Sequence, residues 1–174
     1  MDNRKIYFLI STYPGLPSRM IRLMKHCRYS HSSLGFADDP TVFYSFIKKG
    51  FFEESLPRYL KPDREPFDCE LHEMTVTQAQ YEALQQQIAA FRANRSRYRY
   101  AKVGITLNML GIPARFENRY FCSHFVVELL HRAGIYSPDR PSVMYFPEDL
   151  ARLPGVHRVF HGKMDGLCRY LGLI

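Results

Sequence analysis

The chain has 174 residues, which is enough for one domain that buries a hydrophobic core. Its 46% hydrophobic and 24% charged residues are typical of a globular protein, and no apolar run reaches the roughly 18 residues expected of a membrane helix. The formal net charge of +7 argues against an acidic protein and favours an anionic partner or substrate, such as a phospholipid headgroup, a nucleic acid or an acidic peptide.

Apolar patterns in the first part of the chain predict strands that surround a short helix. Residues 5–11 predict a strand, and a Pro/Gly turn separates it from a short helix over residues 17–27. Residues 30–36 and 41–47 then predict two strands of a hairpin, joined by an Ala-Asp-Asp-Pro loop. His31 opens the first strand of this hairpin.

The middle of the chain combines a proline-rich segment with a strongly patterned helix. Residues 51–66 contain three prolines and predict an irregular surface excursion that could shape a substrate cleft. Residues 67–76 alternate as a strand does, and residues 77–91 carry apolar side chains at helical spacing. The Thr77 to Gln80 spacing fits a capping box at the start of that helix.

The second half of the chain is predicted to be mainly helical. Residues 100–112 predict one helix, and a second begins near Cys122 and is closed by Gly134. A short helix beginning at Pro147 and a last strand over residues 156–160 follow. These elements predict an α+β fold in which a small antiparallel sheet packs against helices.

The whole chain, residues 1–174, is predicted to be a single domain, because no repeat or linker divides it. The apolar stretch at residues 6–10 is too short for a signal peptide, which favours a cytoplasmic protein with reduced thiols. The four cysteines match no CxxC pattern, so we expect neither a metal nor another cofactor.

Cys122 and His31 are the candidate reactive residues. A cysteine at a helix N-terminus lies at the positive end of the helix dipole, which favours the thiolate, and an imidazole can take its proton. Together they are the nucleophile and the base that a thiol hydrolase needs, provided that the fold brings the two segments together. The alternative is that Cys122 is a buried structural cysteine, as we expect for Cys27, Cys69 and Cys168.

A third polar group usually orients the imidazole of such a pair. The neighbouring strand of the predicted hairpin offers Ser45 as the first candidate and Tyr44 as the second. His124 lies two residues after Cys122, and side chains at that spacing do not share a helix face, so we do not expect it to act as the base.

A basic segment over residues 92–102 is the main alternative functional feature. Its arginines alternate with tyrosines, a pattern that can bind a nucleic-acid strand by charge and stacking. A solvated loop explains the pattern as well, and no nucleic-acid-binding motif accompanies it, so nucleic acid is not the expected partner. The cations of this segment are Arg92, Arg95, Arg97, Arg99 and Lys102.

Several motifs together resemble a known family. YSHSSLGF followed by FYSF, YRYAKVGI, RYFCSHFVVELLHRAGI and a proline-led EDL helix are similar to the circularly permuted branch of the NlpC/P60 papain-like superfamily. This branch includes YiiX-like proteins and lecithin retinol acyltransferase-like enzymes, and in it histidine precedes cysteine along the chain. The resemblance implies a papain-like fold with Cys122 as nucleophile and His31 as base. It places the third polar residue, commonly a histidine or an acid, near Tyr44 or Ser45.

These observations predict a cysteine hydrolase that cleaves an amide bond in a peptide-like or cell-wall-peptide-like substrate through a thioester acyl-enzyme. The backbone amide of Cys122 would donate to the oxyanion. Two alternatives stay open. One is a lipid or phospholipid acyl hydrolase or acyltransferase, and the other is a non-catalytic binding module that uses the basic segment.

Overall fold

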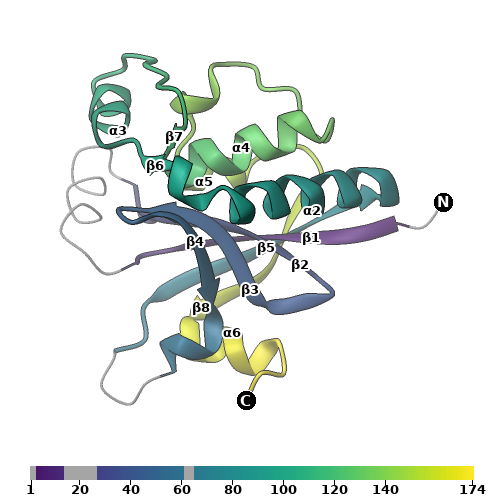
Figure 1. Cartoon of the computed structure of the whole chain (residues 1–174). Helices are drawn as coiled ribbons and strands as arrows, with labels where there is room; N and C mark the ends of the chain where they lie inside the picture. The colour runs from purple at the N-terminus through teal and green to yellow at the C-terminus, as the bar shows by residue number, and fades with distance from the viewer. Residues whose placement is uncertain (1–2, 14–26, 61–64) are drawn as a thin grey trace.

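The computed structural model describes residues 3–13, 27–60 and 65–174 (Figure 1). Its main feature is a six-stranded sheet in the order β4-β3-β2-β1-β5-β8, in which every neighbouring pair is antiparallel. The predicted helix over residues 17–27 falls almost entirely outside the described residues. The strands of the sheet are β1 (Asn3–Ser11), β2 (His31–Phe36), β3 (Asp39–Ile47), β4 (Gly50–Ser55), β5 (Asp68–Thr77) and β8 (Val156–Lys163).

One prediction for the sheet is wrong. Residues 51–66 were expected to form an irregular excursion, but residues 51–55 belong to strand β4, which pairs with β3 and makes one edge of the sheet. Gly50, with a φ of +100°, allows the chain to turn back after β3, a backbone conformation that favours glycine. The strand ends at Ser55 because Pro57 begins a short 3₁₀ helix over Leu56–Tyr59.

Four of the five predicted helices are present, the one over residues 17–27 lying almost entirely outside the described residues, and one further α-helix was not predicted. The capping box of Thr77 forms as expected, because its hydroxyl accepts from the Gln80 amide and the Gln80 side chain accepts from the Thr77 amide. The unpredicted helix is α6, which follows the last strand. The helices are α2 (Gln78–Ala93), α3 (Lys102–Met109), α4 (Cys122–Arg132), α5 (Pro147–Leu150) and α6 (Met164–Tyr170), and a minor pair of strands is β6 (Arg99–Tyr100) and β7 (Arg119–Tyr120).

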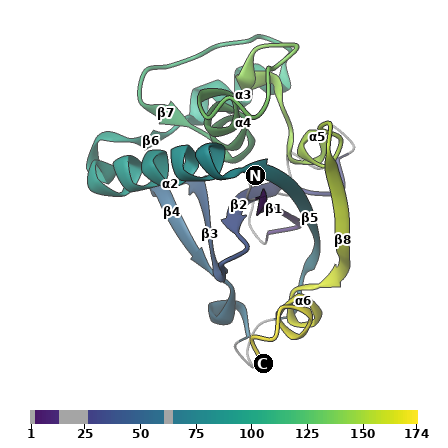
Figure 2. The ribbon, with the colours of Figure 1, turned by 90° about the vertical axis from the view of Figure 1, so that its right-hand side faces the viewer.

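Helices α2 and α4 cover one face of the sheet, whereas α6 lies on the opposite side (Figure 2). The larger core contains an aromatic cluster between the sheet and the two helices. Phe125 of α4 lies at its centre, with ring centroids 5.0 Å from those of both Phe46 and Phe91 and 5.9 Å from that of Phe51. The predicted α+β fold with a small antiparallel sheet packed against helices is therefore confirmed.

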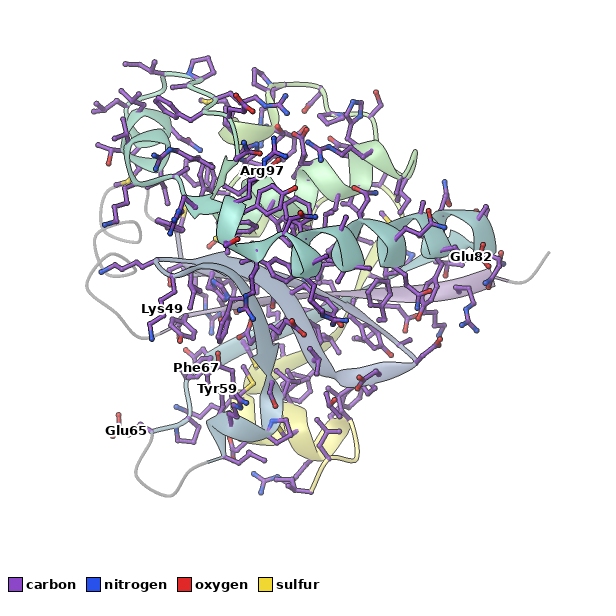
Figure 3. The ribbon with its side chains drawn as sticks, in the orientation of Figure 1. Lys49, Tyr59, Glu65, Phe67, Glu82 and Arg97 are labelled. Atoms are coloured by element: carbon purple, nitrogen blue, oxygen red, sulfur yellow. The ribbon has the colours of Figure 1, made fainter. Side chains whose placement is uncertain are left out.

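A smaller core lies on the α6 side of the sheet. There Cys69 of β5 and Cys168 of α6 are both fully buried among apolar side chains. Tyr59 and Phe67 pack edge to face at this core, with ring centroids 5.2 Å apart (Figure 3). Within residues 3–13, 27–60 and 65–174, no helix has the length and apolar character needed to cross a bilayer.

Candidate active site

Cys122 is the first residue of α4, as the sequence predicted. It is 5% exposed, and its thiol is close enough to the imidazole of His31 for each group to shift the pKa of the other. The preceding N-cap residue, Phe121, has no polar side chain, so the first turn of the helix carries no side-chain cap. The thiol therefore lies where the helix dipole favours a negative charge.

His31 is the first residue of β2 and lies between the thiol and a carboxylate. Its Nε2 is 3.2 Å from Oε2 of Glu54, and its ring is tilted against that of Tyr13, with the centroids 5.1 Å apart. Because Nε2 faces Glu54, Nδ1 is the ring nitrogen left for Cys122. The fold thus brings together two residues from distant segments of the chain.

Glu54 is the polar partner of His31 that the sequence interpretation missed. It lies on β4 with no exposed surface, and the hydroxyl of Tyr59 donates to its Oε1 at 2.9 Å. A fully buried carboxylate is costly unless it is paired and hydrogen-bonded, as it is here. The alternation of Glu53 and Glu54 across a strand was the available signal, since it directs the first carboxylate outward and the second inward.

The charges in this group stabilise one another. Burial raises the pKa of Cys122, but its hydrogen bond to His31 and the imidazolium charge outweigh burial and lower the pKa below its usual value. Burial lowers the pKa of His31, yet the charges of Glu54 and Cys122 prevail and raise the pKa to about 10. Glu54 also keeps a lowered pKa, because the charge of His31 outweighs its burial. The group favours a thiolate, an imidazolium and a carboxylate together.

The buried cysteines of the smaller core provide a contrast. Burial raises the pKa of Cys69 to about 12 and also raises the pKa of Cys168, so both thiols stay protonated at neutral pH. Both are at least as buried as Cys122, but no histidine contributes to the pKa of either thiol. Burial alone therefore does not account for the lowered pKa of Cys122.

The two sequence candidates for the third group, Ser45 and Tyr44, bond to other partners. The hydroxyl of Ser45 donates to the backbone carbonyl of Ser32 at 2.6 Å. The hydroxyl of Tyr44 accepts from Nη2 of Arg92 at 3.3 Å. The position next to the imidazole is taken by Glu54, one strand further along the sheet than expected.

The Tyr44→Phe variant should retain the alkylation rate of Cys122. Its hydroxyl bonds to a half-exposed arginine, so its loss should also reduce the free energy of unfolding by less than about 1 kcal/mol. The check is the rate of Cys122 modification by iodoacetamide, followed by mass spectrometry alongside the wild type. A marked slowing of Cys122 alkylation in this variant would mean that Tyr44 contributes to the site.

The basic segment over residues 92–102 does not form one continuous charged tract. Arg92 pairs with Glu53, Arg95 donates to the carbonyl of Phe51, and Arg97 lies 3.9 Å from Glu117. Its last cations, Arg99 and Lys102, instead line a surface pocket of about 560 Å³. The segment is thus divided between structural contacts and a pocket wall.

That pocket borders the candidate active site. Tyr100 lines the pocket and is close enough to Cys122 for a thiolate there to add to the effect of burial in raising the pKa of Tyr100, and the amide of Ala101 donates to the carbonyl of Tyr120 at 2.9 Å. Lys48 and Arg119 add two further cations to its wall, and none of the described residues that line it is acidic. The positively charged pocket wall therefore includes a residue, Ala101, that packs against Phe121 at the start of α4.

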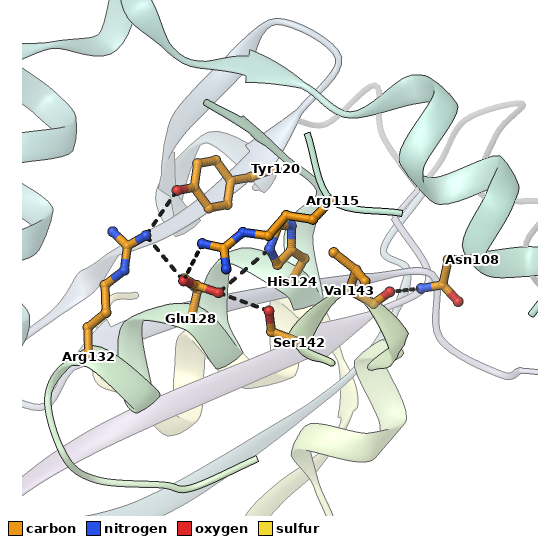
Figure 4. A network of polar contacts seen from close by, with 8 residues as sticks. All are labelled: Asn108, Arg115, Tyr120, His124, Glu128, Arg132, Ser142 and Val143. Atoms are coloured by element: carbon orange, nitrogen blue, oxygen red, sulfur yellow. Dashed lines mark hydrogen bonds and ion pairs between the residues drawn. The ribbon is translucent and has the colours of Figure 1, made fainter. Parts of the chain in front are cut away.

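A separate polar network holds the loop after α3 against α4 (Figure 4). Arg115 and Arg132 both donate to Oε1 of Glu128, at 2.9 and 3.2 Å, and the hydroxyl of Ser142 donates to Oε2 at 2.9 Å. His124 faces Glu128 across 3.8 Å, while burial lowers the pKa of His124 to about 4. His124 thus belongs to this network and stays neutral at physiological pH.

Comparison with known proteins identifies no family or relative, so the function is inferred from the geometry of the site. No protein-family model matches the chain, and a search of curated proteins found no significant relative.

Proposed function

We propose that this protein is a thiol-dependent acyl-transfer enzyme in which Cys122 is the nucleophile and His31 is the general acid and base. Glu54 is the positioning residue, since it holds the imidazole and stabilises its positive charge. The observation that carries the proposal is the buried series Cys122, His31 and Glu54, in which Cys122 is the first residue of α4. The permuted papain-like fold belongs to the same proposal and is supported by this histidine strand and cysteine helix.

The proposed reaction has two steps. The thiolate attacks the substrate carbonyl, and the tetrahedral intermediate collapses as the imidazolium gives its proton to the leaving amine or alcohol. The product of this step is a thioester on Cys122 with a neutral His31. His31 then removes a proton from water or another acceptor, which attacks the thioester and releases the acyl group together with the restored thiolate. The backbone amide of Cys122 is the proposed oxyanion donor.

An amide in a peptide-like substrate is the first candidate for the bond that is cleaved. The cationic pocket, whose wall adjoins the start of α4, supports a substrate with a negative charge near that bond. An ester of a lipid is the second candidate, and the exposed apolar side chains beside the pocket favour it. Both bonds pass through the same thioester, so one experiment tests the shared chemistry.

Incubation with p-nitrophenyl acetate should place an acetyl group on Cys122. Intact-mass and peptide mass spectrometry should find one adduct that hydroxylamine removes, with Cys69 and Cys168 unmodified. Cys122→Ala should abolish the adduct, and His31→Gln should slow its formation about 10²–10⁴-fold, the range typical of a lost acid-base group. Acetylation of Cys122 no faster than that of the other cysteines, or unaffected by His31→Gln, would reject the enzyme in favour of a structural cysteine.

A further inference from the structure

The strongest unexplained surface is formed by α3 and the loop after it. Four large apolar side chains are exposed there: Val103 at 61%, Leu110 at 63%, Ile112 at 49% and Phe116 at 37%. Only two other large apolar side chains are as exposed among the described residues, and both lie at the C-terminal end, on α6 and after it. We call these four side chains the apolar patch.

The helix and loop that carry the apolar patch are held in place by contacts on their buried side. Asn108, which is fully buried in α3, donates to the carbonyl of Val143, and Ile105 packs against the small cluster around Phe121. The loop after the helix is fixed by the ion pair of Arg115 with Glu128 (Figure 4). Because α3 and the loop after it are anchored in this way, the four side chains of the patch stay exposed.

Positive charge adjoins the apolar patch. Val103 and Phe116 themselves line the basic pocket together with Lys48, Arg99, Lys102 and Arg119. Residues 99–119 contain a single acidic residue, Glu117, which lies within ion-pair distance of Arg97. Among the described residues, no ion pair engages the four pocket cations. The surface thus combines exposed aliphatic side chains with uncompensated cations.

We infer that this surface docks on an anionic phospholipid bilayer. Phosphate headgroups would contact the four pocket cations while the apolar patch enters the boundary between headgroups and acyl chains, the combination used by proteins that bind one leaflet. A nucleic-acid strand fits less well, because Val103, Leu110 and Ile112 have no aromatic face on which a base could stack. The inference goes beyond the proposed reaction and does not require Cys122 to be catalytic.

The test is co-sedimentation of the full chain, carrying Cys122→Ala to exclude turnover, with vesicles of two compositions. The protein should sediment with vesicles of equal parts phosphatidylglycerol and phosphatidylcholine, less so as salt increases, and remain in solution with pure phosphatidylcholine. Leu110→Ser with Ile112→Ser should weaken binding. Arg99→Gln with Arg119→Gln should weaken it by about fivefold for each cation removed.

Matched controls carry the same substitutions elsewhere on the surface. Tyr170→Ser with Ile174→Ser removes the other exposed apolar side chains, and Arg152→Gln with Arg169→Gln removes two other exposed cations. These controls should bind like the parent, with circular dichroism confirming the fold of every variant. Equal losses in controls and test variants, or no sedimentation with the anionic vesicles, would overturn the inference. Binding to a single-stranded oligonucleotide without binding to vesicles would also overturn it.

Discussion

Replacing Glu54 with glutamine should slow the reaction of Cys122 with iodoacetamide by at least about tenfold on the acidic limb of the rate profile, because a shift of one pKa unit changes the thiolate fraction tenfold at pH values below the pKa. The carboxylate contacts the imidazole directly and therefore stabilises the imidazolium more than it disfavours the more distant thiolate. Glutamine keeps the shape of the side chain and can still accept from Tyr59, but it removes the charge.

The pH dependence of the rate gives the sign of this effect. The thiol pKa is lowered and the pKa of His31 is raised to about 10, so the reactive ion pair exists between these two values in the wild type. The rate falls as pH drops through the lowered thiol pKa. In Glu54→Gln the acidic limb of the profile should move to higher pH, because the imidazolium is less stable and the thiol keeps its proton longer.

Glu53→Gln is the matched control, since it makes the same change one residue away. Glu53 pairs with Arg92 on the exposed side, 31% of its side chain being accessible. Its pH profile should overlay that of the wild type. If the profiles of Glu54→Gln and Glu53→Gln coincide while both variants remain folded, Glu54 does not tune the thiol and the positioning role is wrong.

The second large effect is expected on stability. Phe125→Ala should lower the free energy of unfolding by about 3–5 kcal/mol, the usual cost of removing a fully buried phenylalanine side chain. Phe125 has no exposed surface and packs against rings from β3, β4 and α2, so the cavity would open where α4 meets the sheet. Urea denaturation followed by circular dichroism measures the change.

Two further variants make the stability result interpretable. Phe125→Leu fills most of the cavity and should cost clearly less than the alanine variant. Leu110→Ala, on an exposed side chain, should stay within about 0.5 kcal/mol of the wild type. A small cost for Phe125→Ala would mean that α4 is not anchored through this ring and that the start of the helix is less firmly placed than the structure indicates.

The positions of Cys122 and His31 within their elements could be predicted because the signals are local. The apolar spacing after Cys122 marks a helix start, and the run from His31 to Phe36 marks a strand within a hairpin. Their contact could not be derived from those patterns, because it depends on how distant segments pack. The resemblance to permuted papain-like proteins supplied it as an expectation, and the structure brings the two residues together.

Glu54 shows why the rest of the site was not predictable by the same means. Three prolines after Ser55 dominated the interpretation of residues 51–66, although the strand is complete before Pro57 begins the next turn. Acidic side chains are also expected at the surface, and only the three-dimensional arrangement shows that His31 and Tyr59 compensate a buried carboxylate. Local patterns therefore located the candidate pair, Cys122 and His31, but not its charge partner.

The distribution of the site over the chain has a consequence for synthesis. His31 and Glu54 are 23 residues apart, on the first and third strands of the β2-β3-β4 meander, so this meander can form early, whereas Cys122 joins only when α4 has been made and docked. Until then its thiol has the ordinary pKa of about 8.5 and is mostly protonated at neutral pH. A nascent chain in which α4 has not docked therefore carries a thiol with a smaller thiolate fraction, and the lowered pKa arises together with the fold that encloses the thiol.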